Sequence, residues 1–425
     1  MAQATTIDSP RPVQPTERIE VLDVLRGIAL FGMIIVHCDG HGIKEGRLND
    51  IIGRIEELFL DDRFYSIFAI LFGAGFAIQL IRSKAKGGKF VFRFLRRMAA
   101  LACFGLIAQI GLSYAILFDY ALCGLLLLLV RNWSTKALAI TFFICLMFSP
   151  LYRITENSVK TALFGVEKTK QLISERKAQL TTAVIESGKR GYMANQTHNY
   201  ITALKLRSKN FATGFLVEKE RKLILLLSGP FMLILLGFIA IRLKIFEEPV
   251  KHRRLIVWLM IAGTILWAIH FWVIPFFNIT PALEYPNVPF PIQMTLAYAS
   301  NGFGIFLDNW LSFTYIGAIL LLVSYNPEKW LRHFRFFAWV GRMALTNYML
   351  QALILSLAFS KYAFGLPKMP EVFMVPIFAT GIFVLFVWFS RWWLRRYQYG
   401  PLEWIWRSVT YWKKQPLRVT QKTTN

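Results

Sequence analysis

Three ionisable residues lie on the first apolar stretch of the chain, where charge is costly. Asp23 and Arg26 are three residues apart, close enough on one helix face to pair, and ten residues separate Arg26 from His37. A continuous helix would place Arg26 and His37 about 16 Å apart, near opposite ends of one membrane span. An imidazole titrates near neutral pH, so His37 suits general acid–base chemistry; the alternatives are an interfacial histidine and a helix-end ion pair.

Two further sets of polar residues lie on predicted helices. The stretch GRMALTNYMLQ places four polar side chains on neighbouring faces of one helix, where they serve either a substrate or contacts between helices: Arg342, Thr346, Asn347 and Gln351. The segment EWIWRSVTYWKK mixes tryptophans with basic residues, which is typical of an interfacial helix on an anionic leaflet, and Glu403 should pair with Arg407.

The elements that carry these residues are membrane helices. Of the 425 residues 55% are hydrophobic and 17% charged, which excludes a water-soluble globule. The net charge of +24 comes from lysines and arginines that flank apolar runs, so it indicates topology and not nucleic acid. Neither GxGxxG nor a Walker pattern is present, and the cysteines form no CxxC pair, so we expect no NAD, no ATP and no metal.

Apolar runs of about 20 residues predict an all-α, polytopic bundle of about ten spans. The basic loop that contains Arg93, Arg96 and Arg97 is placed in the cytoplasm, and alternation then puts both termini there. The runs are 21–36, 64–81, 98–118, 120–130, 137–151, 223–241, 255–273, 310–323, 336–359 and 373–389.

The spans divide the chain into five parts. A polar tail, 1–20, precedes an N-terminal half of about five spans, 21–152; a second half, 223–395, precedes a basic and aromatic cytoplasmic tail, 396–425. Between the halves, 153–222 is an extracytoplasmic, mostly helical insert, either an amphipathic helix on the membrane or a lid over an outward-facing site. Residues 292–306 are expected to form a half-helix or re-entrant segment.

Several stretches resemble known families. RIEVLDVLRGIALFGMIIVH resembles the opening span of the transmembrane acyltransferase superfamily, in which an Arg, ten residues and a catalytic His follow one another; Arg26 and His37 match. The chain as a whole is similar to the YeiB-like family of bacterial membrane proteins, through DRFYSIFAILFGAGFAI, VGRMALTNYMLQALI and RWWLRRYQYGPLEWIWRSVTY. This resemblance implies a multi-pass protein of the bacterial inner membrane.

The chain departs from the YeiB-like pattern at two positions. Members often have Asn at the place of His37, and Ala115 stands where they carry an Asp. Asp119, four residues later, is the candidate to replace that carboxylate.

The resemblance implies transfer of an acyl group from a cytoplasmic acyl-CoA to an extracytoplasmic glycan or lipid-linked acceptor, by an O- or N-acyltransferase. The catalytic candidates are His37, Asp23, Arg26 and Asp119, and the CoA phosphates would meet Arg93, Arg96 and Arg97. The alternative is a transporter or flippase, because ten helices with a polar interior also suit alternating access.

Overall fold

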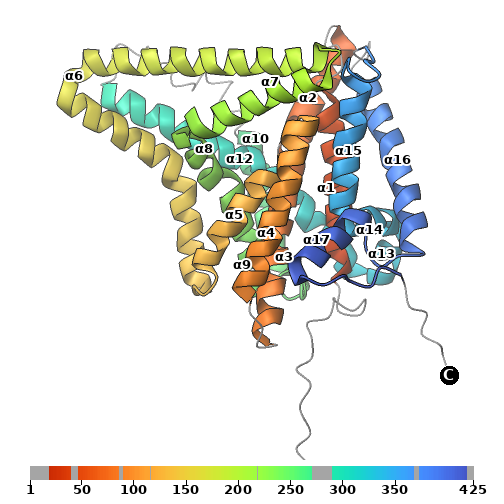
Figure 1. Ribbon diagram of the computed structural model, residues 1–425. Coiled ribbons are helices and arrows are strands. Elements are labelled where there is room, and N and C mark those ends of the chain that lie inside the picture. The colour runs from red at the N-terminus through yellow and green to blue at the C-terminus, as the bar shows by residue number, and fades with distance from the viewer. Residues whose placement is uncertain are drawn as a thin grey trace, which may run out of the picture.

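Helices are the regular secondary structure in the part of the chain that the structure describes. The computed structural model describes residues 19–39, 46–85, 90–114, 116–217, 219–269, 290–367 and 373–418 (Figure 1). Within these ranges no strand occurs, and the one isolated β-bridge joins Tyr397 to Arg418. The prediction of an all-α membrane protein is confirmed.

Most predicted spans correspond to helices. The helices that match apolar runs are α1 (Glu20–Asp39), α3 (Arg63–Ala85), α4 (Phe90–Leu106) with the π-turn η2 (Ile107–Gly111), α5 (Leu117–Val130), α9 (Met232–Arg242), α10 (Arg253–Ala268) and α16 (Met374–Leu394). In the part of the chain that is described, five helices are long and apolar enough to cross a bilayer, and three shorter ones are also apolar. The count of ten spans and the cytoplasmic termini stay predictions.

The insert begins inside a helix that is longer than expected. Helix α6 (Thr135–Gln196) contains the predicted span and continues through position 153, so no structural break separates the two. Gly165 adopts φ 79°, a conformation that glycine accepts easily, and there α6 folds back into two arms. The second arm crosses the top of the bundle in Figure 1, with α7 (Tyr200–Ala212) beneath it. The segment η3 (Thr213–Val217), α8 (Lys219–Leu226) and η4 (Leu227–Phe231) leads back to α9.

Two sequence predictions about the second half are wrong. Residues 292–306 form no half-helix, because α12 (Phe290–Tyr325) is one uninterrupted helix; an intact helix satisfies its own backbone even where glycines lower its propensity. The run 336–359 is not one span, because Met343 (φ −112°, ψ 37°) separates α14 (Arg335–Arg342) from α15 (Ala344–Phe359). The helix α13 (Pro327–His333) precedes them.

Two short helices lie at opposite ends of the bundle. The amphipathic α2 (Arg47–Phe59) lies at the top in Figure 1, and α17 (Pro401–Tyr411), the predicted interfacial helix, lies at the bottom against α4 and α15. We call these the histidine end and the arginine end, after the residues described below.

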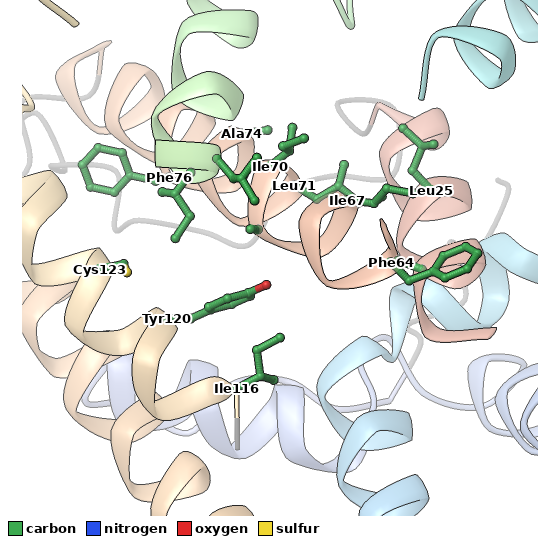
Figure 2. Close-up of a cluster of buried hydrophobic side chains, with 14 of the residues drawn as sticks. Leu25, Phe64, Ile67, Ile70, Leu71, Ala74, Phe76, Ile116, Tyr120 and Cys123 are labelled. Atoms are coloured by element: carbon green, nitrogen blue, oxygen red, sulfur yellow. The ribbon is translucent and has the colours of Figure 1, made fainter. Parts of the chain in front are cut away.

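Close packing fixes the central helices against one another. A methyl group at Gly341 of α14 would lie 1.9 Å from the carbonyl oxygen of Asp23, so α14 and α1 touch backbone to backbone. Around α3, apolar side chains fill the interior (Figure 2). These contacts hold Asp23 and Arg26 beside Arg342.

Candidate functional site

Two cavities lie along the same four helices, α1, α3, α5 and α15. One, of about 280 Å³, lies at the arginine end, and the other, of about 720 Å³, lies at the histidine end. We call them the arginine cavity and the histidine cavity. Tyr120 and Tyr348 line both, so the cavities meet at these two rings.

Five guanidinium groups, each from a different helix, line the arginine cavity. They come from α1, α3, α4, the end of α14 and α17: Arg26, Arg82, Arg97, Arg342 and Arg407. Asp23 and Glu403 are the carboxylates on its wall. Arginines outnumber carboxylates, so the cavity is suited to an anion, and planar guanidinium groups suit phosphate oxygens.

The three arginines predicted to meet the CoA phosphates, Arg93, Arg96 and Arg97, do not all line this cavity. Arg97 lines the cavity, with its guanidinium 3.6 Å from the centroid of the Trp406 ring, and the Trp406 indole N–H donates to the Arg97 carbonyl oxygen. Arg96 lies outside the cavity lining and faces Phe92 and Trp412, while Arg93 donates to the Ser83 hydroxyl at 3.1 Å. That the three arginines bind one ligand stays a prediction; of the three, Arg97 alone is in the lining of this cavity, because successive helical positions point in different directions.

Asp23 and Arg26 form the predicted ion pair. The Arg26 Nη1 donates to Asp23 Oδ1 at 2.8 Å, and Asp23 is 8% exposed. Helix α1 is continuous through His37, so the pair and the histidine lie near opposite ends of one helix, as expected. The four catalytic candidates thus separate into two pairs, Asp23 and Arg26 in one cavity and His37 and Asp119 in the other.

Glu403 caps the N-terminus of α15. Its carboxylate accepts hydrogen bonds from the backbone N–H groups of Leu345 and Thr346, at 2.7 and 3.1 Å, and from the Thr346 hydroxyl at 2.5 Å. Burial raises the pKa of the Glu403 carboxyl, although these hydrogen bonds oppose the shift. The predicted pairing with Arg407 is corrected: the Arg407 guanidinium lies 4.4 Å from the centroid of the Tyr399 ring.

His37 stands among aromatic rings in the histidine cavity. Its ring centroid lies 4.6 Å from that of Tyr114, 5.7 Å from that of Tyr65 and 6.3 Å from that of Tyr348. The Gln351 amide nitrogen donates to the Met33 carbonyl oxygen at 3.2 Å and lies 2.5 Å from His37 Nδ1. With the amide turned this way, Nδ1 accepts and Nε2 carries the ring proton; with Oε1 toward the ring, the two nitrogens exchange these roles.

The rest of the histidine cavity is lined by hydroxyl, amide and aromatic groups. Its polar lining includes Asp62, Ser66, Ser113, Asn195, Asn309, Ser356 and Ser360. Asp119 also lines it and forms an ion pair of 2.8 Å with Lys222. Lys222 is on α8, 103 residues after Asp119, and no local pattern in the sequence connects the two.

The four polar residues of GRMALTNYMLQ have different partners. Arg342 is on α14 and not on the helix of the other three, which corrects the prediction of one helix. Asn347 is fully buried and donates to the Val340 carbonyl oxygen and the Ser390 hydroxyl, both at 3.0 Å. Thr346 donates a hydrogen bond to Glu403. Gln351 contacts His37, and Arg342 lines the arginine cavity.

The insert covers the histidine cavity through one hydrogen-bonded network. Gly191 and Asn195, from the second arm of α6, line the cavity. Arg207 of α7 is 4% exposed and donates to the Gly111 carbonyl oxygen at 2.7 Å, to Asn195 Oδ1 at 2.8 Å and to the Tyr362 hydroxyl at 3.3 Å. The insert is therefore fastened to η2 and to the segment after α15.

Sequence similarity extends over nearly the whole chain. Residues 240–413 match the family described as "Protein of unknown function (DUF418)". The chain is 27% identical to the uncharacterised protein YxaH of Bacillus subtilis (strain 168), over 97% of this chain and 98% of the relative. It is 28% identical to an uncharacterised 39.9 kDa protein in the amylase 3′ region of Bacillus acidopullulyticus, over 96% and 97%. To the uncharacterised protein YeiB of Escherichia coli (strain K12) it is 26% identical, over 93% and 96%. No solved structure matches.

Proposed function

For this chain, which belongs to the YeiB-like family of bacterial membrane proteins, we propose the activity of a membrane acyltransferase. It passes an acyl group from an acyl-CoA at the arginine cavity to an acceptor at the histidine cavity. The observation that carries the proposal is the joint arrangement of the cavities: a cluster of arginines and a histidine lie at opposite ends of the same helices, and two tyrosines line both spaces.

The arginine cavity supports an acyl-CoA donor through its charge. Five guanidinium groups against two carboxylates leave a local positive excess, and CoA carries several phosphates. Arg97 is held by the Trp406 ring and Arg26 by Asp23, so both are fixed before a ligand binds. Such preorganisation lowers the conformational entropy lost on binding.

His37 is the group proposed to act in the transfer. The oxygen of an acceptor hydroxyl bonds to the acyl carbon, the carbon–sulfur bond of the thioester breaks, and the hydroxyl proton ends on the departing thiolate. With Nδ1 accepting from Gln351, the His37 Nε2–H group donates a hydrogen bond to the thioester carbonyl oxygen as negative charge develops there, and it keeps its proton. His37 becomes a base if the amide turns, so that Gln351 Oε1, which has no hydrogen-bond partner among the described residues, accepts the Nδ1 proton.

The acceptor belongs to the larger cavity. Hydroxyl and amide side chains with three tyrosine rings suit a glycan or a lipid-linked sugar. We assign the arginine end to the cytoplasm, where acyl-CoA is made, and the histidine end to the other face of the bacterial inner membrane, as the distribution of basic loops favours. Asp119 with Lys222 is the charged pair in contact with this space.

The test compares neighbouring arginines in the purified full-length protein in nanodiscs. Arg97→Gln removes a guanidinium from the cavity, and Arg96→Gln removes the neighbouring one, which is not in the cavity lining, so that variant is a matched control. We expect acetyl-CoA to raise the melting temperature of the wild type and of Arg96→Gln, and to lose most of this effect in Arg97→Gln.

Release of free CoA from acetyl-CoA in the presence of bacterial envelope glycans then reports the transfer itself. No stabilisation of the wild-type protein by acetyl-CoA or a longer acyl-CoA would reject the donor. Movement of a glycan or lipid across proteoliposomes without acyl-CoA would replace the proposal with the transporter or flippase.

A further inference from the structure

Two tyrosine side chains form the boundary between the cavities. Tyr120 of α5 and Tyr348 of α15 are 2% and 1% exposed, and both line the arginine cavity and the histidine cavity. In Figure 2 the Tyr120 side chain extends from α5 into the space beside α3. Any ligand that reaches from Arg26 to His37 passes these two rings.

The two hydroxyl groups differ in their hydrogen bonding. The Tyr120 hydroxyl donates to the Tyr65 carbonyl oxygen at 2.8 Å, so Tyr120 is held in place. The Tyr348 hydroxyl is buried and has no hydrogen-bond partner in the described part of the chain. A buried hydroxyl without a partner destabilises the folded state, and such groups in native proteins call for a functional explanation.

Helix α15 provides a line of contacts along the boundary. Leu345 lines the arginine cavity, Tyr348 lines both, and Leu355 and Ser356 line the histidine cavity. The intervals of three and seven residues keep Leu345, Tyr348 and Leu355 on one helix face, and Gln351, which contacts His37, lies between the last two. The open Tyr348 hydroxyl is therefore midway along a path that joins the two sites.

We propose that Tyr348 is a positioning residue at the throat of a single passage, where its hydroxyl donates a hydrogen bond to a carbonyl oxygen of the ligand. The ligand class is an anionic head group on a slender chain that contains amide or thioester carbonyls. The head stays among the arginines while the chain passes between Tyr120 and Tyr348 toward His37, over about 16 Å of helix. The choice of acyl-CoA as that ligand rests on the proposed function.

The first experiment uses a matched pair of tyrosine variants in the full-length protein. Tyr348→Phe keeps the ring and removes the unpaired hydroxyl, so we expect an unchanged or higher melting temperature; Tyr120→Phe loses its hydrogen bond and melts lower. Tyr348→Phe should raise the Kd of acetyl-CoA about 5- to 10-fold, as for one lost hydrogen bond. The Kd of adenosine 3′,5′-bisphosphate, which has the anionic head and no chain, should not change.

The second experiment needs no assumption about the donor. In a Cys103→Ala background, Ser356→Cys places a thiol in the histidine cavity, and the anionic reagent sulfonatoethyl methanethiosulfonate is added on the arginine side of oriented vesicles. Tyr348→Ala should increase labelling at position 356 at least 10-fold, as measured by mass spectrometry. Leu355→Ala, which enlarges the histidine cavity alone, should leave the rate as it was.

The outcomes separate the throat from the acyl-CoA donor. Equal labelling rates in Tyr348→Ala and its parent overturn the passage, whatever binds at the arginines. An acetyl-CoA Kd unchanged in Tyr348→Phe overturns the hydrogen bond to the chain. Faster labelling without any acetyl-CoA binding supports the throat and rejects the proposed donor.

Discussion

The cavities at the two ends of the molecule differ in size and in charge. The arginine cavity is small, strongly cationic and walled by α17, whereas the histidine cavity is more than twice as large and is lined mainly by hydroxyl, amide, aromatic and apolar groups, with the carboxylates of Asp62 and Asp119. A cationic pocket binds an anion without regard to its chain, and a pocket of mixed polar and aromatic groups selects shape and hydrogen bonding. In the proposed function, recognition of the charged ligand and the chemistry at His37 are therefore separate.

The covers of the two ends also differ. At the arginine end, α17 holds α15 through the Glu403 carboxylate and α4 through Trp406. At the histidine end, the insert is held by the neutral and cationic hydrogen bonds of Asn195 and Arg207. Changes at one end should therefore leave the ligand binding of the other nearly intact.

The largest expected effect is on catalysis at the histidine end. His37→Gln removes the imidazole and should lower the rate of acyl transfer by about 10²- to 10⁴-fold. The Kd of acetyl-CoA, measured by thermal shift, should change less than about twofold, because the arginine cavity does not include this residue. A parallel loss of binding would show that the two ends are not separate.

The next effect is on stability at the arginine end. Gly341→Ala forces a methyl group against the Asp23 carbonyl oxygen and should destabilise the protein by about 3 kcal/mol. Gly381→Ala on α16 is the control, since a methyl group there meets nothing within 4 Å. Urea titration in mild detergent compares the two variants, and equal midpoints would contradict close packing of α1 on α14.

A smaller effect is expected at the cover of the histidine end. Arg207→Met keeps most of the side-chain volume and removes three hydrogen bonds, at a cost of about 1.5–3 kcal/mol. Hydrogen exchange should accelerate in the second arm of α6 and in α7, while exchange in α17 stays as in the wild type. Uniform acceleration over the whole chain would mean that the insert is not an independent cover.

The smallest effect concerns pH at the arginine end. Because burial raises the folded-state pKa of Glu403, folding favours the neutral carboxyl relative to the unfolded chain, and the resulting contribution to stability is fully present below the ordinary Glu value of about 4.3. That contribution is lost as pH rises through the raised pKa. Glu403→Gln stays neutral at every pH. Its melting temperature should be closest to that of the wild type at low pH and should rise relative to it as pH increases. A constant difference from pH 4 to 8 would contradict the shift.

The sequence predicted the features that depend on one helix at a time. The apolar run 21–36, the Asp23–Arg26 pair and the separation of Arg26 from His37 follow from helical geometry, and the structure has all three. The YeiB-like resemblance is supported along nearly the whole chain. The helical character of the insert also follows from its pattern.

Features that depend on contacts between distant segments were not predictable. Arg97 differs from Arg96 because Trp406, 309 residues later, packs against one of them. The break at Met343 lies inside the apolar run 336–359. This run contains no proline, so hydropathy alone predicts one span. No pattern in the sequence marks Lys222 as a site residue, because its partner Asp119 belongs to another span.

The Glu403 cap also imposes an order on synthesis. The N-terminus of α15 receives its carboxylate only when a residue 58 positions after Leu345 has been made. At about 5–20 residues per second, the ribosome needs roughly 3 to 12 seconds to cover that distance. During this interval the first N–H groups of α15 rely on other partners, so a chain that stops before Glu403 carries an open helix end at the lining of its own arginine cavity.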